Sequence, residues 1–448
     1  MQRGMAAILA AQHAMGHEIV VFTHAPRMES DFETGVPFRH FVIGDGEMRS
    51  PAPSPTRLAK LRAAVSEAGC DLVVHHEYYA NYAVDDLRLM DEMGVPVLFQ
   101  WHSCFCALNM EMSWEGHAAE QFEGIARYAR CVITLSSMDK AFFELMGVPA
   151  VRIPYSDPDM FDSVPVHGSG HKLLWTGRIV SGKRPLHALQ ILERVLERFP
   201  DATLAMLGDG PRRRDVEDYL AKRPGLAAHV SLPGFINDIT SCLRDADVFL
   251  VTSSFEGFMH SLMEAKMAAL PTVGYRMDYL DTTRPGTGYC AVPQGDVDAA
   301  AEEVCRLLAD VDERRRLGAL ARKDFERFLN LDQKALYKEA FDLALHPGRR
   351  PQPPPDAPAA SAVLRVLLDH VDAHFRERQE TRSRLNGKLQ KEIAALKSSW
   401  AYRVGMVVTW PARKTWGGVK CLRENGVKYT VKHAVGKVLR LFGSKGRW

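Results

Sequence analysis

Segment 247–272, DVFLVTSSFEGFMHSLMEAKMAALPT, most constrains how this chain can fold. Its short apolar run at 248–251 has the length of a buried strand, and small polar residues end that strand. Apolar residues then recur at helical spacing over 259–270, and a proline stops the helix. The segment therefore predicts a strand, a tight loop and a helix, with Glu256 in the loop and Glu264 inside the helix.

The start of such a helix can hold an anionic group. Its first backbone N–H groups have no partner within the helix, and they lie at the positive end of the helix dipole, so phosphate is the usual ligand. Two carboxylates beside a phosphate would repel it unless they face other groups. Ionised carboxylates accept hydrogen bonds from hydroxyls, so we expect sugar diols as the partners of Glu256 and Glu264.

A second loop supplies positive charge. The sequence GRIVSGKRP places Arg178 and Lys183 directly after another predicted strand, 172–176. A diphosphate needs such partners, because the negative charge that develops on a leaving phosphate must be neutralised. Each signal alone is weak, since a glutamate at a helix start is more often a cap and a Gly-Arg pair more often a simple turn. Their combination predicts a diphosphate between cations and carboxylates.

Strand and helix signals alternate through two successive series, which predicts two α/β domains with parallel sheets covered by helices. The first series has strands at 18–23, 38–43, 71–75, 95–101 and 131–135, and helices at 1–15, 55–68, 116–130 and 137–146. The second series adds strands at 172–176, 203–207, 230–232 and 272–275, and helices at 185–199, 212–220, 297–308, 312–328 and 332–344. We expect two Rossmann-like, doubly wound domains, 1–165 and 166–346, facing a cleft at the carboxyl ends of their strands.

The C-terminal part has a different composition. Residues 347–362 form a proline-rich linker, and 363–399 read as a long helix that could form a short coiled coil and self-associate. From Ala401 onward the chain has 11 Lys or Arg and one acidic residue, whereas the rest has 46 basic and 54 acidic residues. Tryptophan and tyrosine beside these cations favour binding of 400–448 to an anionic membrane surface, with a solvated tail as the alternative. The acidic body argues against nucleic acid as the partner.

Other features narrow the class of protein. The eight cysteines include no CxxC pair, so neither a zinc site nor a disulfide framework is expected. No signal segment and no run of 18 apolar residues occurs, which favours a cytoplasmic protein.

Three DxD pairs, at 157–159, 245–247 and 296–298, resemble metal ligands, but we expect no metal. The pair at 245–247 precedes a buried strand, and Pro158 stiffens the first pair. After the sequence GDGP at 208–211, Arg213 stands where a dinucleotide fingerprint has its third glycine, so an NAD site is not supported. We expect the pair His75 and His76 to line the cleft rather than to bind metal.

In this order, the motifs resemble those of the GT-B glycosyltransferases, specifically the retaining family numbered four. GRIVSGK resembles the donor-phosphate loop, GDGP its characteristic turn, and FEGFMHSLMEA the motif of two glutamates separated by seven residues. In the first domain, WHSCF resembles the segment whose histidine contacts the sugar, and PYSDP falls where the family's chain crosses between domains.

The resemblance assigns roles residue by residue. It implies that Arg178 and Lys183 contact the donor diphosphate, with Gly177 in the same loop, and that Glu256 and His102 contact the transferred sugar. It further implies that Gly257 and Phe258 lend backbone N–H groups and that Glu264 binds the nucleotide ribose.

The chain departs from the family at two places. The family begins with a strand and a glycine pair near the diphosphate, whereas only Arg3-Gly4-Met5 matches it here, so Gly4 is carried over as a donor contact. Because this domain begins on a helix, we expect a further strand encoded upstream of Met1. Segment 275–288, YRMDYLDTTRPGTG, lacks the family's glycine-rich pattern, which leaves the donor sugar open.

These observations predict a metal-independent hexosyltransferase without a cofactor. It would move a sugar from a nucleotide-diphosphate donor to a hydroxyl of a sugar or lipid-linked acceptor, in cell-surface polysaccharide or glycoconjugate synthesis at the inner face of the membrane. Retention of the anomeric configuration is implied by the resemblance alone. Two alternatives remain: a nucleotide-sugar epimerase or phosphorylase of the same fold, and a non-catalytic scaffold. An epimerase would need no acceptor, a phosphorylase would need inorganic phosphate, and a scaffold would bind no nucleotide sugar.

Overall fold

The computed structural model describes residues 2–24, 35–44, 55–77, 83–104, 118–155, 170–346 and, within 381–395, all but 382 and 393. The predicted proline-rich linker, 347–362, and basic tail, 400–448, lie outside these residues.

The second domain is built on one parallel sheet of six strands in the order β12-β11-β10-β7-β8-β9. The strands are β7 (Lys172–Thr176), β8 (Thr203–Leu207), β9 (Val230–Gly234), β10 (Val248–Val251), β11 (Thr272–Tyr275) and β12 (Tyr289–Val292). From β7 the chain moves outward to β9 and then returns to the other side of β7 with β10. The carboxyl ends of β7 and β10 therefore flank a topological switch point, where open α/β sheets bind their ligands.

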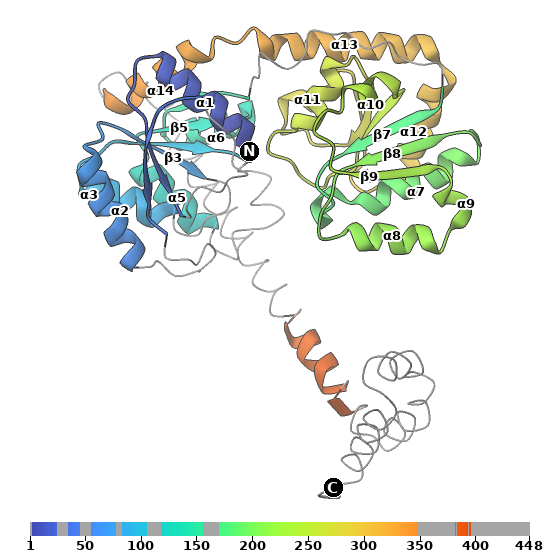
Figure 1. The fold of residues 1–448 in the computed structure, drawn as a ribbon, viewed down its shortest axis with the longest axis horizontal. Helices are drawn as coiled ribbons and strands as arrows, with labels where there is room; N and C mark the ends of the chain where they lie inside the picture. The colour runs from blue at the N-terminus through green and yellow to red at the C-terminus, as the bar shows by residue number, and fades with distance from the viewer. Residues whose placement is uncertain are drawn as a thin grey trace, which may run out of the picture. The chain divides into compact units, whose positions relative to one another are not determined.

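Helices cover both faces of this sheet (Figure 1). One apolar core lies under α7 (Pro185–Leu196), α8 (Arg213–Ala221) and α12 (Val297–Ala309). The other lies under α10 (Thr240–Asp245), α11 (His260–Met267) and the second half of α13 (Val311–Leu329). The short helices are α9 (Pro224–Ala227) and the 3-10 turns η2 (Ser181–Lys183) and η3 (Asp281–Thr283).

The described strands of the first domain form two parallel sheets, β1-β2 and β3-β4-β5-β6. They are β1 (Val20–Thr23), β2 (Arg39–Val42), β3 (Val73–Glu77), β4 (Val97–Trp101), β5 (Cys131–Thr134) and β6 (Ala150–Arg152). The helices are α1 (Gln2–Ala14), α2 (Pro55–Ala68), α3 (Ala83–Glu92), α5 (Ala118–Tyr128) and α6 (Ser137–Leu145). No described strand joins β1 to β3, and a strand upstream of Met1 stays a prediction.

The last helix of the body, α14 (Gln333–Leu345), packs on the first sheet, although the sequence analysis places it in the second domain. Tyr337 and Phe341 of α14 lie in one core with Leu98, Ile133 and Val151 of the first sheet. The Tyr337 hydroxyl accepts a hydrogen bond from Gln100 Nε2 at 3.1 Å. The chain therefore enters the second domain once and returns to finish the first.

Helices α3, α9 and α10 and strands β6 and β12 are not among the elements predicted from the sequence. The helix predicted over 259–270 is shorter, because α11 spans His260–Met267. Strands β6 and β12 have three and four residues, so their apolar signal is short. Helix α3 has a clear signal, since Ala83, Leu87 and Met90 recur at helical spacing and are buried.

Residues 383–392 form a helix in a unit separate from residues 1–375. Leu385 and Leu389 are 61% and 57% exposed on it. Self-association through 363–399 stays a prediction.

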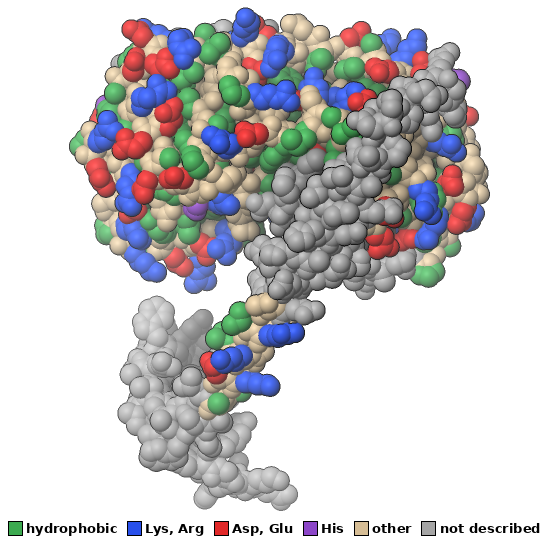
Figure 2. Space-filling model, turned by 180° about the vertical axis from the view of Figure 1, so that it is seen from behind, with side chains coloured by type: hydrophobic (Ala, Val, Ile, Leu, Met, Phe, Trp, Pro, Cys, Tyr) green, Lys and Arg blue, Asp and Glu red, His purple; other side chains and the backbone are tan. Residues whose placement is uncertain are grey.

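The surface carries both signs of charge. On the face drawn in Figure 2, Lys and Arg side chains are interspersed with Asp and Glu and with scattered hydrophobic side chains. Of the helices in the described part of the chain, none combines the length and the hydropathy that a membrane crossing requires.

A buried lysine joins α11, which follows the candidate site, to α13. Lys266 is fully buried, and its Nζ donates to Asp324 Oδ2 at 2.7 Å and to the carbonyl oxygen of Thr287 at 2.7 Å. Burial lowers the pKa of this amine to about 6. A buried polar group of this kind is tolerated only where its partners satisfy its hydrogen bonds.

We expect Lys266→Met to lower the free energy of unfolding by about 3 kcal/mol, because it removes the buried amine that donates to the Asp324 carboxylate and to the Thr287 carbonyl. Urea denaturation measures this change. The matched control is Lys323→Met on the exposed side of α13, which we expect to change stability by less than about 0.5 kcal/mol. Equal stabilities of the two variants would contradict the structural role of Lys266.

Candidate active site

The loops that follow β7 and β10 form a single unit at the switch point. Ser254 N donates to the carbonyl oxygen of Gly182 at 2.8 Å, and Thr252 Oγ1 donates to that of Lys183 at 2.7 Å. Trp175 Nε1 in turn donates to Thr252 Oγ1 at 2.9 Å. These bonds fix η2, and with it Lys183, against the segment that carries Glu256.

The same loop is fixed on its other side by the GDGP turn after β8. Ile179 N donates to the carbonyl oxygen of Asp209 at 2.9 Å. Gly208 has φ +139°, and a Cβ there would lie 2.0 Å from the carbonyl oxygen of Gly177. Only glycine permits both this conformation and this approach. The two glycine loops therefore pack backbone to backbone at the mouth of the sheet.

Lys183 and Glu256 form an ion pair in this unit. Lys183 Nζ donates to Glu256 Oε1, and Ser253 Oγ donates to the same oxygen at 2.5 Å. The Glu256 side chain is 9% exposed and that of Lys183 is 25% exposed. Tyr279 Oη accepts a hydrogen bond from Glu256 N at 2.9 Å. The two charges were predicted to contact different groups of a donor, whereas in the structure they contact each other directly.

The backbone beyond Glu256 offers hydrogen-bond donors. Among the described residues, no group accepts a hydrogen bond from the N–H of Gly257 or Phe258, which precede α11. Helix starts with N–H groups of this kind bind anions.

Gly257 also marks the point where the first domain reaches the second. A Cβ at Gly257 would lie 2.4 Å from Cα of Ser103 and 2.9 Å from its carbonyl carbon. Ser103 follows His102 in the loop after β4. The predicted histidine segment and the predicted glutamate segment are therefore in contact.

His102 lies between two further polar side chains, His76, which was predicted to line the cleft, and Tyr155, which was not predicted for the site. Its Nε2 is 2.8 Å from Nδ1 of His76 at the end of β3, and its Nδ1 is hydrogen-bonded to the hydroxyl of Tyr155. Burial lowers the pKa of His102 to about 4 and lowers the pKa of His76 well below its usual value. Both imidazoles are therefore neutral near pH 7.

Sequence comparison identifies the family. Residues 170–310 match the family described as "Glycosyl transferases group 1", and residues 1–155 match "Glycosyl transferase 4-like domain". The chain belongs to the group 1 glycosyltransferases. Ser103 lies in the first matched region and Gly257 in the second, so the two regions contact each other at these residues.

Individual glycosyltransferases show the same relationship. The chain is 29% identical over 146 residues to a sulfoquinovosyl transferase of Arabidopsis thaliana, which is 32% of this chain and 28% of that protein. It is 23% identical over 377 residues to a D-inositol 3-phosphate glycosyltransferase of Corynebacterium kroppenstedtii, which is 75% of this chain and 83% of that protein. The match to the Arabidopsis enzyme thus spans less than a third of its length.

Solved structures confirm the two-domain GT-B fold. A sucrose-phosphate synthase of Thermosynechococcus elongatus superposes with a TM-score of 0.60 at 19% identity, covering 76% of this chain and 92% of that one. The Anabaena protein HepE in complex with UDP superposes with a TM-score of 0.56 at 16% identity, covering 75% of this chain and 95% of that one.

Arg178, Glu264 and Gly4 are the remaining predicted site residues of this glycosyltransferase. Arg178 is exposed, and its guanidinium has no hydrogen-bond or ion-pair partner among the described residues. Glu264 is partly buried in α11. Gly4 lies in α1.

Two of the three DxD pairs, 245–247 and 296–298, lie within the described residues, and both have structural roles. Asp296 caps α12 by accepting from Ala299 N at 2.9 Å. Asp245 pairs with the Lys172 ammonium, and Asp247 accepts from Lys172 N at 3.0 Å. The described part of the chain holds no group of three His, Cys, Asp or Glu residues arranged to bind a metal ion.

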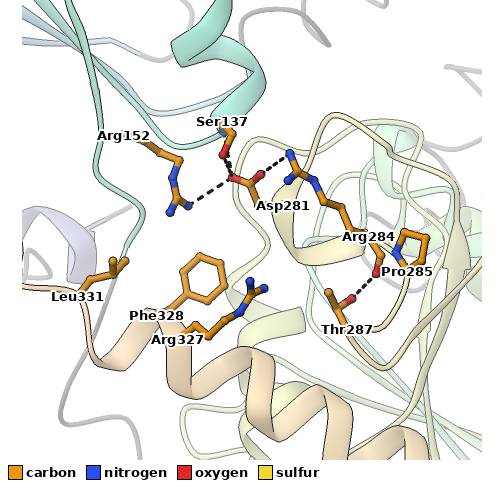
Figure 3. A pocket seen from close by; sticks show the side chains of 9 residues that line it. All are labelled: Ser137, Arg152, Asp281, Arg284, Pro285, Thr287, Arg327, Phe328 and Leu331. Carbon is orange, nitrogen blue, oxygen red and sulfur yellow. Dashed lines mark hydrogen bonds and ion pairs between the residues drawn. The ribbon is translucent and has the colours of Figure 1, made fainter.

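A second interdomain contact centres on Asp281 in η3 (Figure 3). Its Oδ2 accepts from Ser137 N and Ser137 Oγ, each at 2.9 Å, and lies 3.3 Å from the Arg152 guanidinium. Ser137 begins α6, so the carboxylate also complements the positive end of that helix. A cavity of about 370 Å³ adjoins this contact, with Arg152 and Arg327 at its wall.

Three residues that shape the site were not predicted for it: Tyr155, Tyr279 and Asp281. Tyr279 and Asp281 lie in segment 275–288, which the sequence analysis singled out only as a departure from the family. Tyr155 lies in the crossover motif PYSDP.

We expect Gly257→Ala to lower sugar-transfer turnover at least about 10-fold, because the new methyl group displaces the Ser103 backbone and moves the two halves of the site apart. Thermal unfolding should change little, since the two domains keep their cores. The matched control is Gly225→Ala in α9, where a Cβ meets nothing within 4 Å. Wild-type turnover in Gly257→Ala would show that the approach of the two loops has no role in transfer.

Proposed function

We propose that this protein transfers a hexose-type sugar, with retention, from a nucleoside diphosphate donor to a hydroxyl of a sugar or lipid-linked acceptor, in polysaccharide or glycoconjugate synthesis. The observation that carries the proposal is the Lys183–Glu256 pair at the switch point between β7 and β10. Cation, carboxylate and helix start lie at the place where an α/β sheet binds a nucleotide.

Different residues of this site would bind the diphosphate, the sugar and the ribose of the donor. Lys183, Arg178 and the N–H groups of Gly257 and Phe258 would hold the diphosphate, close to the backbone at Gly177. A diphosphate and the Glu256 carboxylate would then share the Lys183 ammonium. Glu256 would accept hydrogen bonds from the transferred sugar, and Glu264 from the ribose.

Rate acceleration would come mainly from electrostatics. When the bond to the sugar breaks, negative charge grows on the leaving diphosphate, and fixed cations and N–H groups stabilise that charge. Two cationic side chains and a helix start supply positive charge at this position, so we propose that transfer requires neither a metal ion nor another cofactor.

Relatives support the proposal by what they act on or bind. The Arabidopsis and Corynebacterium proteins are named as glycosyl-transferring enzymes, and the HepE structure contains UDP. A further relative, from Escherichia coli, is named for a galactosyltransferase acting on a diphosphoundecaprenol-linked sugar. These names favour a nucleotide-sugar donor and a glycan or lipid-linked acceptor here.

Two substitutions separate the roles of the paired charges. We expect Lys183→Met to weaken binding of UDP itself about 10- to 100-fold, because it removes a charge-assisted contact to the diphosphate. Glu256→Gln should leave UDP affinity near the wild-type value and lower turnover about 100-fold, because Glu256 faces the sugar. Calorimetry with UDP and transfer assays with a panel of UDP, GDP and dTDP hexoses measure both.

Exposed residues of the same domain provide matched controls for this pair. Lys222→Met and Glu197→Gln change the same residue types on the outer surface, and both should bind UDP and turn over like the wild type. If GDP or dTDP binds and UDP does not, the comparison is repeated with that nucleotide. Unchanged turnover in both Lys183→Met and Glu256→Gln would overturn the assignment of the site.

We also propose that the protein acts at the cytoplasmic face of a membrane, held there by its basic tail. The full chain should co-sediment with phosphatidylglycerol vesicles and much less with phosphatidylcholine vesicles, and salt should weaken the binding. A shortened chain that ends at His346 should remain in the supernatant. Equal sedimentation of the two chains would contradict a tail anchor.

A further inference from the structure

Three polar side chains form a continuous hydrogen-bonded series beside the candidate site. His76 ends the series in β3, His102 follows β4, and Tyr155 follows β6 in the crossover toward the second domain. The rings of His76 and His102 stack with centroids 5.1 Å apart, and those of His102 and Tyr155 with centroids 5.8 Å apart. All three lie at the carboxyl edge of the first sheet, which faces the ligand side of the fold.

The proton positions in this series are coupled. A neutral imidazole donates from one ring nitrogen and accepts at the other. If His76 donates to Nε2 of His102, then His102 donates from Nδ1 to Tyr155. If Tyr155 donates to Nδ1, then His102 donates from Nε2 to His76. In both arrangements each ring nitrogen of His102 contacts a protein group, so the orientation of this ring depends on both neighbours.

Tyr155 continues the series into the second domain through its ring. The ring packs edge-on against Phe258, with centroids 5.2 Å apart, and lies 4.8 Å from the ring of His260. Gln333 Nε2, at the start of α14, donates to the carbonyl oxygen of Pro154 at 3.0 Å and holds the crossover next to Tyr155. The tyrosine therefore contacts one domain through its hydroxyl and the other through its ring.

These contacts form a closed ring of neighbouring residues that includes the contact between Gly257 and Ser103. His102 bonds to Tyr155, Tyr155 packs on Phe258, and Phe258 adjoins Gly257 in the chain. Gly257 then meets Ser103, which adjoins His102. Glu256, the paired carboxylate, precedes Gly257. Gly257 and His102 are therefore linked through Tyr155 and Phe258 as well as through Ser103.

We propose that Tyr155 is a positioning residue for sugar transfer, whose hydroxyl fixes the ring of His102 while its own ring fixes the loop of Gly257 and Phe258. The proposal rests on the proposed function, because it concerns the same site. The hydroxyl is the part that a purely structural role would not require, since a phenylalanine fills the same space against Phe258 and His260.

Tyr155→Phe tests the hydroxyl with the packing preserved. We expect kcat to fall about 10- to 100-fold, because the part-buried hydrogen bond to His102 is lost and the His102 ring is released. KM for the donor and the melting temperature should stay near the wild-type values, since the diphosphate groups and the domain cores are untouched. The matched control is Tyr219→Phe, which removes a hydroxyl bonded to Glu193 at 2.7 Å, away from the site, and should keep full activity.

A double-mutant cycle asks whether Tyr155 acts through His102. In a His102→Leu background, Tyr155→Phe should cause little further loss, because residues that act through one another are not additive. Activity of Tyr155→Phe within twofold of the wild type, or full additivity with His102→Leu, would overturn the proposal.

A readout without substrate separates this proposal from the proposed function. In ¹⁵N-histidine spectra at pH 7, the resonances of His102, assigned with His102→Gln, should report a neutral ring and should shift in Tyr155→Phe. His76→Asn, whose amide nitrogen can replace Nδ1, should shift them less than His76→Leu. Unchanged His102 resonances in Tyr155→Phe would refute the positioning role. A chain that gives the expected spectra and transfers no sugar would refute only the function.

Discussion

The burial of the Glu256 carboxylate is the condition on which the site depends. An ionised group with so little exposure requires a cation and further hydrogen bonds, and Lys183 and Ser253 supply them. Lys183 reaches this position because η2 is bonded to the segment after β10. That bonding in turn requires β7 and β10 to be neighbours, which the strand order provides. The buried carboxylate requires a nearby cation, and the strand order brings Lys183 to that position.

The features predicted from sequence are those coded by neighbouring residues. The strand, loop and helix around Glu256, the cationic loop at Lys183 and the glycine turn at Gly208 each lie within one short segment, so periodicity and residue type reveal them. The repetition of such segments predicts two doubly wound domains. The resemblance to a known family then connects Lys183, Glu256 and His102, which are separated by many residues in the chain.

The unpredicted features depend on partners that are distant in sequence. Tyr155 bonds to a residue 53 positions away, and Asp281 to one 144 positions away. A lone tyrosine or aspartate in a loop gives no local signal of such a partner. The direct contact of Lys183 with Glu256 was also unforeseen, because spacing shows that two charges approach a common place and does not show their distance. The packing of α14 on the first sheet was also not predicted, because the apolar residues of this helix do not show which domain they contact.

The packing of α14 on the first sheet limits how domains can be exchanged between related enzymes. The segment that carries the donor-side residues is continuous in sequence, yet the helix that completes the opposite domain follows it. A hybrid made by a single crossover near residue 160 would join the first sheet to a foreign α14, whose aromatic face was selected against another sheet. Two junctions, one between 155 and 170 and one near 331, would transplant donor preference and leave Tyr337 and Gln100 in their native pair.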